Sequence, residues 1–363
     1  MKRICIAAGG TGGHIYPALA LAQSAMEQDP DTRILFIGNA DRMEARIVPE
    51  AGFDFAALDT HGLEGSLLDK VKAAISLMRA IPKAGAILDE FRPDIVVGFG
   101  GYVSAPVLRA AHARHIPVMM HEQNSIAGKA NKVTAGCADE IVTCYEKAGE
   151  QFPARKVKLL GNPRGSVAAS AVGDRQVLES LGLDPSKKTI LVMMGSLGST
   201  TMNDIMQQVL DRPVEGLQFL FVTGRGNEDA GRAFEGRPDV KVVPYVDTLA
   251  IYPFISGMIC RAGATTIAEL TARGIPAILV PSPYVAGNHQ FYNASVLKDA
   301  GAAQLVEEKT LLENPEVLRD TIRGFFGSPM ILESAATNAA RLGKPQAAAD
   351  MLQDMRILCG GSR

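Results

Sequence analysis

The chain has 363 residues, of which 47% are hydrophobic and 21% are charged. This composition is typical of a globular enzyme, and the length favours two domains over one. The formal net charge of -2 gives no reason to expect nucleic acid as a partner. The five cysteines are scattered and form no C-x-x-C pair, which argues against a disulfide framework or a zinc site and fits a reducing cytoplasm.

The first half of the chain alternates apolar strand patterns with helical patterns. Strands are predicted at residues 3–8, 33–39, 95–101, 116–124 and 140–145. Helices are predicted at residues 15–26, with Pro17 in the first turn, and at 104–113. Such alternation predicts an α/β fold whose parallel sheet is covered by helices on both faces. No apolar run approaches the length that spans a bilayer, and the N-terminus lacks a signal-peptide pattern.

The pattern breaks at residues 158–166, where we place a linker, and then restarts. Further strands are predicted within residues 189–199, 218–224, 240–246, 257–263 and 276–282. The sequence therefore predicts two tandem doubly wound, Rossmann-like domains, at residues 1–161 and 162–335. A helical segment at 336–358, broken near residues 343–345, could lie back across the first domain.

Three glycine loops follow predicted strands, at Gly9–His14, Gly98–Pro106 and Gly195–Thr200. Glycine lets backbone N–H groups approach an anion, and the helix that follows adds partial positive charge, so three such loops favour phosphate binding. None supplies the lysine of a P-loop. Ile15 stands where a dinucleotide fingerprint needs its third glycine, so a nicotinamide dehydrogenase is a poor fit.

His14 is the one titratable side chain in the first glycine loop. It could simply bond to backbone at a helix start, or it could act as a general base beside a bound anion.

The segment Ile259–Pro281 predicts a strand, a turn and a helix that begins near Thr265. Glu269 in that helix could accept ribose hydroxyls or merely complement the helix dipole. Arg261 could bind an anion or form a structural ion pair.

Polar clusters at residues 121–131 and 288–294 could bind sugar hydroxyls or cap helices. With these clusters and the glycine loops, motifs along nearly the whole chain resemble the bacterial MurG glycosyltransferases of family 28. The motifs are GGTGGHIYPALALA, GFGGYVSAP, HEQNSIAGKAN, LLGNPR, MGSLGS, RAGATTIAEL and GNHQFYNA. The resemblance implies the two-domain GT-B fold. It also implies transfer of N-acetylglucosamine from UDP-N-acetylglucosamine to muramyl-pentapeptide diphospho-undecaprenol in peptidoglycan synthesis.

The resemblance also assigns residues. For the donor it implies ribose contact by Glu269 and uracil contact by the Val246 backbone. The other implied donor residues are Thr11, Gly12, Gly13, Asn124, Arg164, Ser196, Arg261, Ala264, Thr265, Thr266, His289 and Gln290. The implied acceptor-diphosphate residues are Gly10, Gly100, Gly101 and Tyr102. This chain departs from the family at His289, where members often carry glutamine, and at Leu197, where a polar residue is common.

The implied reaction inverts the anomeric carbon by direct attack of the acceptor 4-hydroxyl. It needs a base, for which His14 is the leading candidate and Glu122 the fallback. Helix N-termini and glycine amides can stabilise departing UDP, so we expect neither metal nor cofactor. The one D-x-D sequence, Asp29–Asp31, is interpreted as a turn before a strand.

The lipid-linked acceptor gives the segment Ser66–Lys83 a possible role. Leu67, Val71, Ile75, Met78 and Ile81 recur there at helical spacing among Lys70, Lys72, Arg79 and Lys83. An ordinary core-facing helix has this pattern too. With a lipid-linked substrate we expect this helix to dock on anionic lipid at the cytoplasmic face of the membrane, as a peripheral contact.

Two other functions stay open at this point. A UDP-N-acetylglucosamine 2-epimerase or hydrolase of the same architecture would share the Glu269 site and need no lipid acceptor. A non-catalytic recruiter of a sugar nucleotide or lipid carrier would tolerate the loss of His14.

Overall fold

The structure is a computed structural model that describes residues 1–60, 67–195 and 198–360. It divides into two compact units. Unit 1 comprises Met1–Ser166 and the segment from Gln346 onward, and unit 2 comprises Val167–Pro345. The boundaries differ from the expected 161/162 and 335/336, because the chain leaves unit 1 inside a helix and returns only after residue 345.

Unit 1 is built on a seven-stranded, wholly parallel sheet in the order β3-β2-β1-β4-β5-β6-β7. The strands are β1 (Arg3–Ala8), β2 (Arg33–Asn39), β3 (Asp54–Leu58), β4 (Ile95–Gly100), β5 (Val118–Glu122), β6 (Glu140–Thr143) and β7 (Val157–Lys158). Ile4 of β1 pairs with Ile34 on one side and with Ile95 on the other, so the central strands are apolar along their length. The predicted doubly wound fold is therefore confirmed in this unit.

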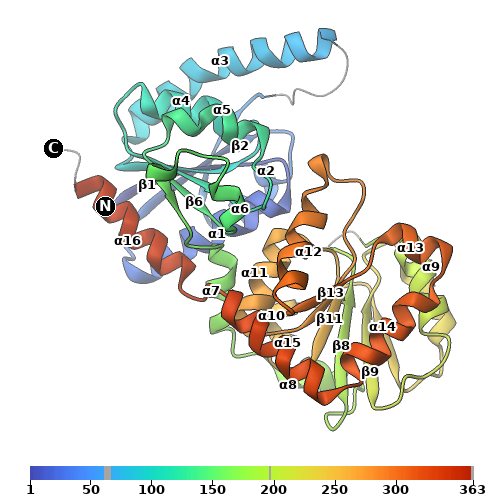
Figure 1. Cartoon of the computed structure of the whole chain (residues 1–363). Coiled ribbons are helices and arrows are strands. Elements are labelled where there is room, and N and C mark those ends of the chain that lie inside the picture. Colours follow the sequence, from blue (N-terminus) through green and yellow to red (C-terminus); the bar gives the residue numbers. More distant parts are fainter. Residues whose placement is uncertain (61–66, 196–197, 361–363) are drawn as a thin grey trace. The chain divides into compact units, whose positions relative to one another are not determined.

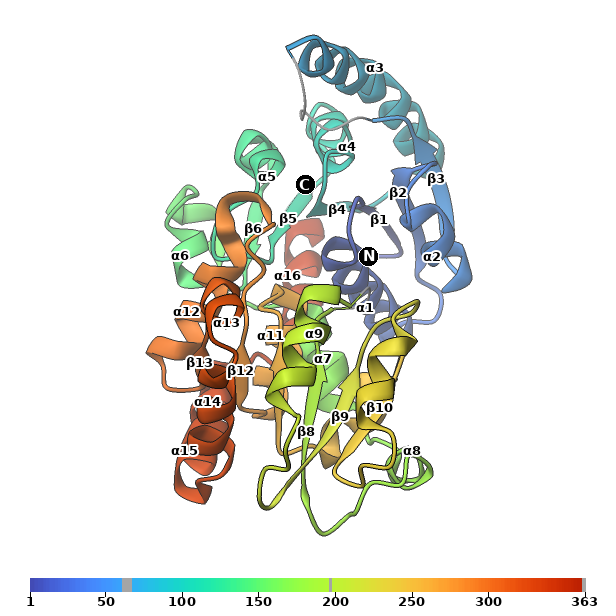
Figure 2. The same ribbon diagram turned by 90° about the vertical axis from the view of Figure 1, so that its right-hand side faces the viewer.

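Helices cover both faces of the unit 1 sheet (Figures 1 and 2). They are α1 (Gly12–Gln28), α2 (Glu44–Glu50), α3 (Leu67–Phe91), α4 (Ser104–His112), α5 (Lys129–Thr134), α6 (Glu146–Gly149) and α16 (Ala347–Gly360). Side chains of α1 and α16 share a buried cluster with Ile4 and Phe36, whereas α3 and α4 pack on the other face with Cys5 and Val96. Two separate apolar layers thus hold the sheet between them.

Helix α1 begins earlier than predicted. The sequence places the glycines and His14 in a loop, but the helix starts at Gly12, and His14 and Ile15 both donate their N–H to the Thr11 carbonyl at 3.0 and 3.2 Å. Glycine is tolerated in a first turn because tertiary contacts outweigh its low helix propensity. His14 therefore projects from a helix N-terminus, and Pro17 lies in the second turn instead of the first.

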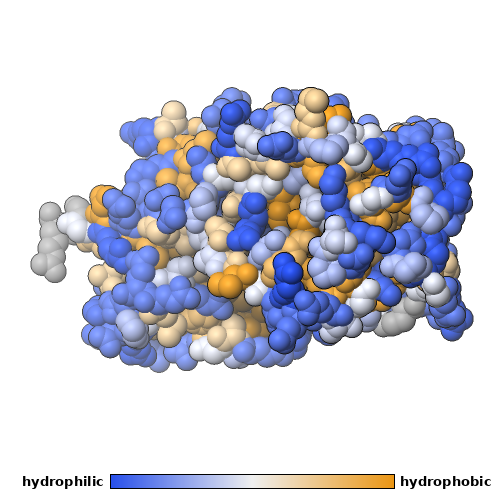
Figure 3. Space-filling view, turned by 90° about the horizontal axis from the view of Figure 1, so that it is seen from below, coloured by the Kyte–Doolittle hydropathy of each residue, from blue (hydrophilic) through white to orange (hydrophobic). Residues whose placement is uncertain are grey.

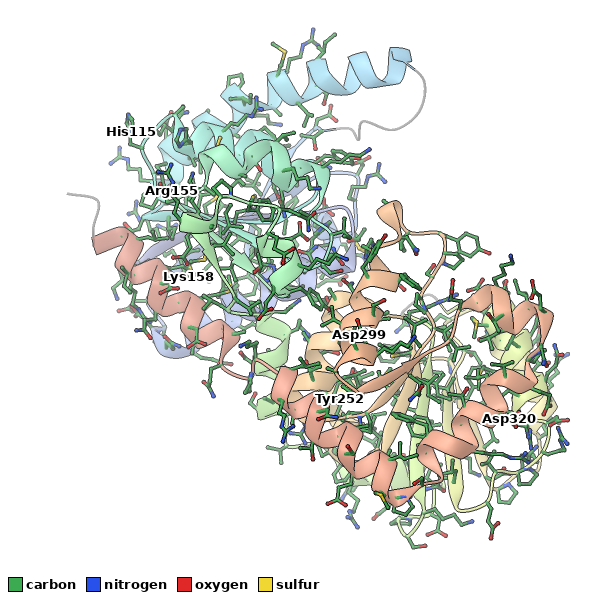
Figure 4. The ribbon with its side chains drawn as sticks, viewed as in Figure 1. His115, Arg155, Lys158, Tyr252, Asp299 and Asp320 are labelled. Carbon is green, nitrogen blue, oxygen red and sulfur yellow. The ribbon has the colours of Figure 1, made fainter. Side chains whose placement is uncertain are left out.

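The returning helix α16 is part of the unit 1 core. Met351, Leu352 and Met355 are fully buried in the same cluster as α1. Lys158 binds Asp354 of this helix at 2.7 Å and Glu140 of β6 at 2.9 Å, and Figure 4 shows it beside α16. Apolar packing and an ion-pair network therefore both fix the last helix to this unit.

Unit 2 repeats the architecture with a six-stranded parallel sheet in the order β10-β9-β8-β11-β12-β13. The strands are β8 (Lys188–Met193), β9 (Leu217–Val222), β10 (Val240–Val243), β11 (Gly257–Cys260), β12 (Ala277–Leu279) and β13 (Ala303–Leu305). Its core joins β8 and β9 to buried side chains such as Met206 of α9 and Phe326 of α14. The second predicted doubly wound domain is thereby confirmed.

The helices of unit 2 include α8 (Arg175–Ser180), α9 (Thr200–Val209), α10 (Thr248–Ile251), α11 (Ala264–Arg273), α12 (His289–Asp299), α13 (Glu308–Glu313), α14 (Glu316–Phe326) and α15 (Pro329–Leu342). Short 3-10 helices occur in the chain at Ala135–Cys137, Ala154–Lys156, Glu228–Phe234, Tyr252–Phe254 and Ala286–Asn288. The predicted helix break at residues 343–345 is confirmed between α15 and α16. Of the segment 336–358 that could return to the first domain, residues 336–342 instead pack in unit 2 as the end of α15.

The predicted linker is partly helical. Helix α7 (Pro163–Ser170) starts at a proline, which lacks the N–H that a first helical position leaves unbonded. The chain passes from unit 1 to unit 2 within this helix.

The turn predicted at Asp29–Asp31 is confirmed: Asp29 accepts the Asp31 N–H at 3.2 Å and binds Lys2 at 2.9 Å.

Hydrophilic residues cover most of the face drawn in Figure 3, with hydrophobic residues in smaller areas between them. Within the part of the chain that the structure describes, no helix combines the length and the apolar character needed to cross a bilayer.

Candidate functional site

The candidate site of unit 1 lies where strand order reverses, between β1 and β4. Loops at the carboxyl ends of such strands diverge and leave room for a ligand. Here those loops are Gly9–Thr11, after β1, and Gly101–Val103, after β4. The fold therefore brings the first two glycine motifs to one edge of the sheet.

His14 is half-buried between these loops. Its Nδ1 lies 2.9 Å from the Gly9 carbonyl oxygen and 3.2 Å from Thr11 Oγ1. A carbonyl oxygen only accepts, so Nδ1 carries the proton in that bond and Nε2 carries the lone pair of the neutral ring. The arrangement presents Nε2 as a proton acceptor, which is what a general base requires.

The second glycine loop packs against the first without side chains between them. Gly100 has φ +104°, and a Cβ atom there would lie 2.8 Å from Cδ2 of His14. Gly101 has φ +84°, and a Cβ atom there would clash with the Gly9 carbonyl. Both the backbone conformation and the close approach require glycine at these two positions.

Glu44 is a residue of this site that the sequence analysis did not identify. It is the first residue of α2 and is fully buried. Its Oε2 accepts the Gly10 N–H at 3.2 Å and its Oε1 accepts the Asn39 N–H at 3.0 Å. One carboxylate therefore ties the loop after β1 to the end of β2. The only sequence signal was an acid at a helix start, which many helices have.

A second polar group lies at the end of β5. Glu122 is 1% exposed and accepts N–H groups of Gly128 at 2.8 Å, Asn124 at 3.0 Å and the Asn131 side chain at 2.9 Å. Burial raises the pKa of Glu122, and these three donors oppose that shift. Glu122 thus shapes the 123–128 loop, and its occupied oxygens make it a poor alternative to His14 as a base.

The other predicted residues of unit 1 lie in several segments. Asn124 follows β5 and is half-buried, as is Tyr102 after β4. Arg164 lies in the first turn of α7, where its N–H donates to the Asn162 side chain at 3.0 Å. Gly10 is exposed with φ +88°, but its N–H already donates to Glu44.

The candidate site of unit 2 occupies the corresponding point between β8 and β11, where its strand order reverses. A pocket of about 690 Å³ lies there. Its lining includes Ser199 and Thr200 at the start of α9 and Gly263 and Thr266 at the start of α11. Two helix N-termini thus face one pocket, which favours an anionic ligand.

Arg261 lines this pocket, and its guanidinium is also fixed by contacts with neighbouring protein groups. Its Nη2 lies 2.5 Å from Oε2 of Glu308, which is 2% exposed, and 3.4 Å from Ser199 Oγ. Its Nη1 donates to the Val280 carbonyl at 3.2 Å. The sequence left Arg261 as either an anion ligand or a member of a structural ion pair. In the structure its guanidinium is paired with Glu308 and also lines the pocket, so it can do both.

Helix α11 carries four of the predicted donor residues. Thr266 lines the pocket, and Ala264 is buried at the first position of the helix. Thr265 Oγ1 is buried and has no hydrogen-bond partner among the described residues, which is unusual for a hydroxyl. Glu269 is buried, and Tyr252 Oη donates to its Oε2 at 2.8 Å. Glu269 is not among the described residues that line the pocket.

The remaining predicted residues of unit 2 are only partly brought together. Gln290 lines the pocket, and its Oε1 accepts the Ser282 N–H at 2.9 Å. The adjacent His289 is half-buried, and burial lowers its pKa. Val246 is buried in the segment between β10 and α10. Ser196 and Leu197 lie outside the described residues.

No group of three or more His, Cys, Asp or Glu side chains that could hold a metal ion occurs within residues 1–60, 67–195 and 198–360.

Comparison with known proteins places this geometry in a family. Residues 4–143 match the glycosyltransferase family 28 N-terminal domain, and residues 189–351 match the corresponding C-terminal domain. Both matches contain one of the two strand-order reversals described above.

Similar curated proteins extend over the whole chain. The UDP-N-acetylglucosamine--N-acetylmuramyl-(pentapeptide) pyrophosphoryl-undecaprenol N-acetylglucosamine transferase of Lactiplantibacillus plantarum is 41% identical, over 96% of this chain and 98% of the relative. Its namesake from Oenococcus oeni is 42% identical, over 95% and 94%. The crystal structure of Acinetobacter baumannii MurG covers 98% of this chain and 100% of its own, at a TM-score of 0.81 and 27% identity.

The resemblance read from the motifs and the fold it implied are therefore both confirmed. The chain belongs to glycosyltransferase family 28 and, within it, to the UDP-N-acetylglucosamine--N-acetylmuramyl-(pentapeptide) pyrophosphoryl-undecaprenol N-acetylglucosamine transferases.

Proposed function

We propose that this chain transfers N-acetylglucosamine from UDP-N-acetylglucosamine to the 4-hydroxyl of muramyl-pentapeptide diphospho-undecaprenol, with inversion, in peptidoglycan synthesis. The observation that carries the proposal is full-length similarity at about 40% identity to transferases named for this reaction. The two loop sites at strand-order reversals supply the chemistry that such a reaction needs.

His14 acts as the general base in this proposal. Nε2 takes the proton of the acceptor hydroxyl as its oxygen bonds to the anomeric carbon of the donor. The bond from that carbon to the diphosphate breaks at the same time, and UDP leaves with the electron pair. The bond from Nδ1 to the Gly9 carbonyl holds the ring in the required tautomer throughout.

The pocket of unit 2 takes the donor. The N-termini of α9 and α11 favour the diphosphate and stabilise its charge as UDP departs, and Arg261 adds a fixed positive charge. Gln290 offers an amide to the sugar, and Thr266 lines the pocket at the start of α11. From the family resemblance, Thr265 is assigned to the donor diphosphate and Glu269 to the ribose.

Unit 1 takes the acceptor. Its diphosphate lies at the loops after β1 and β4, where Gly101 and Tyr102 are half-buried and directly follow Gly100, the buried last residue of β4. The Gly10 N–H contributes less to this site than the sequence suggested, because Glu44 already accepts it. Thr11, Gly12, Gly13, Asn124 and Arg164 stay assigned to the donor sugar and nucleotide from the resemblance.

Helix α3 is the element that we propose for docking at the membrane surface. Ile75 and Met78 are 45% and 71% exposed, and Arg79 and Lys83 are exposed beside them, whereas Ile81 packs against the core. Exposed apolar side chains among basic ones suit an anionic lipid surface. The side chains of Lys70, Lys72 and the rest of residues 66–74 lie outside the described residues.

A vesicle-binding assay tests the docking proposal. Arg79→Glu combined with Lys83→Glu should weaken binding to vesicles that contain anionic lipid. The matched control, Arg46→Glu with Lys132→Glu, makes the same charge change at exposed sites on α2 and α5 and should bind like the wild type. Equal binding by both double variants would refute the role of α3.

A transfer assay tests the reaction itself. The protein is incubated with labelled UDP-N-acetylglucosamine, with and without a short-chain muramyl-pentapeptide diphospholipid. Label should enter the lipid fraction only when the acceptor is present. Release of UDP or formation of an epimer without acceptor would instead identify a hydrolase or epimerase, and binding without turnover would identify a recruiter.

A further inference from the structure

One peptide unit connects Glu44 to His14. The Gly9 carbonyl lies 2.9 Å from Nδ1 of His14, and the Gly10 N–H donates to Glu44 Oε2 at 3.2 Å. These two groups belong to the same peptide bond, so the contacts form one continuous chain. It runs from the carboxylate, through the N–H and the carbonyl of a single planar amide, to the imidazole.

We propose that Glu44 is the positioning carboxylate of His14 and that it acts through the Gly9–Gly10 peptide. A carboxylate that accepts the N–H of an amide increases the negative charge on that amide's carbonyl oxygen, because hydrogen bonds in series polarise one another. The Gly9 carbonyl is thereby a better acceptor for the His14 Nδ1 proton. The inference rests on the proposed role of His14 as the base.

Two glycines next to Glu44 leave room for its side chain. A Cβ atom on Gly9 or Gly38 would collide with the Glu44 side chain, so both positions leave the space that the carboxylate occupies. Glu44 has no ion-pair partner among the described residues, and its oxygens accept only backbone N–H groups there. A charge buried without a cation is costly unless hydrogen bonds compensate, and here one of those bonds goes to the peptide that holds His14.

The same contacts define what Glu44 does during the reaction. When Nε2 takes the acceptor proton the ring becomes cationic, and its Nδ1–H bond to the Gly9 carbonyl becomes charge-assisted. The carboxylate at the other end of the peptide stabilises that cation without touching the substrate. Glu44 thus has the role that a directly bonded carboxylate has in a catalytic triad, with a peptide interposed.

Steady-state kinetics of Glu44→Gln test the proposal. The amide keeps the shape of the side chain but removes its charge and one acceptor. We expect kcat to fall by about 10- to 100-fold, the range for outer-shell partners of metal-bound histidines, with KM for UDP-N-acetylglucosamine unchanged within about twofold. The matched control is Thr60→Val, which deletes a buried hydrogen bond of 2.7 Å to Asn39 in the same corner but leaves the peptide intact.

A double-mutant cycle separates this role from simple loss of structure. In a His14→Ala background, Glu44→Gln should reduce kcat by less than about twofold further, because its effect passes through His14. Undiminished loss in that background, or an equal loss in Thr60→Val, would overturn the inference. Absence of transfer by the wild type would instead overturn the proposed function, and full kcat in His14→Ala would overturn both the role of His14 as base and this inference.

A spectroscopic measurement needs no turnover. Ring ¹⁵N chemical shifts of neutral His14 in the wild type should report the tautomer protonated at Nδ1, and Glu44→Gln should increase the Nε2-protonated form. A wild-type ring protonated at Nε2 would overturn the inference, and this holds even if Glu44→Gln fails to fold.

Discussion

At the scale of single residues, Gly100 leaves the space that the ring of His14, the proposed general base, occupies. We expect Gly100→Ala to lower kcat by at least about tenfold, since the new methyl group would lie within 2.8 Å of the His14 ring and the backbone has φ +104°. Strain at such a site costs on the order of 1–3 kcal/mol. Kinetics and a urea unfolding curve measure both effects. Gly136→Ala, where a Cβ atom meets nothing within 4 Å, is the control and should change neither.

His121 makes the stability of unit 1 depend on pH. Burial lowers its pKa from 6.5 to about 4. Between pH 6.5 and 4 the folded ring stays neutral while the unfolded ring binds a proton. The contribution of His121 to the free energy of unfolding is therefore complete above pH 6.5 and is lost as the pH falls toward 4. The lowered pKa makes this contribution about 3 kcal/mol.

Urea titrations of the wild type at pH 7, 5.5 and 4.5 should therefore show a decline that is shallower in His121→Gln. The control His112→Gln replaces an exposed histidine and should follow the wild type. If His121→Gln and the wild type decline in parallel, the buried ring does not carry the pH dependence.

The sequence was informative about residues whose signals are local. His14 and the glycines beside it could be identified because the strand, the loop and the helix start follow one another within 15 residues. Glu44 could not, because its role depends on contacts with Gly10 and Asn39 that only the folded sheet creates. The pairing of Arg261 with Glu308 was likewise invisible, since a sequence does not say which acid reaches a given arginine.

At the scale of elements, α16 is the returning part of the unit 1 core. Leu352→Ala should lower the free energy of unfolding by about 2–5 kcal/mol, because the side chain is fully buried against the sheet. Ile357→Ala on the same helix removes a side chain that is 59% exposed and should cost less than about 0.5 kcal/mol. Chemical unfolding of both variants checks this, and equal costs would contradict the packing described here.

Elements with strong apolar patterns were predictable, and short ones were not. The central strands β1, β4 and β8 were expected because parallel strands buried on both faces carry unbroken apolar runs. The edge strands β3 and β13 were missed, since DFAAL and AQL are too short and too rich in alanine to stand out as apolar runs, and each strand pairs with a single neighbour. The early start of α1 was missed because glycine predicts a loop wherever tertiary contacts do not override it.

At the scale of the whole molecule, the two sites lie in different units, so their substrates should respond to different substitutions. Gln290→Ala should raise KM for UDP-N-acetylglucosamine by about tenfold, the equivalent of one lost hydrogen bond of about 1.4 kcal/mol. KM for the lipid acceptor should stay within about twofold. Gln208→Ala, an exposed glutamine of unit 2, is the matched control.

Tyr102→Phe in unit 1 should show the reverse, with a raised KM for the acceptor and an unchanged KM for the donor. Steady-state titration of each substrate at saturation with the other gives all four constants. A rise in both KM values from either substitution would mean that Gln290 and Tyr102 do not each serve a single substrate.

The presence of two similar domains could be predicted, whereas the return of the chain from the second domain to the first could not. The strand and helix pattern stops and restarts once in the sequence, which indicates two domains. The return to unit 1 at residue 346 depends on where Met351, Leu352 and Met355 find a matching surface. An amphipathic helix shows the same periodicity whichever domain it covers.

This discontinuous path has a consequence for biosynthesis. All of unit 2 is contiguous in the sequence, but unit 1 needs helix α16, which is synthesised only after the whole of unit 2. During translation the face of the first sheet that α16 will cover stays open to water, with Ile15 and Leu19 of α1 lacking their final neighbours. Unit 2 can complete its core before α16 is available. Unit 1, whose synthesis starts before that of unit 2, is therefore completed after it.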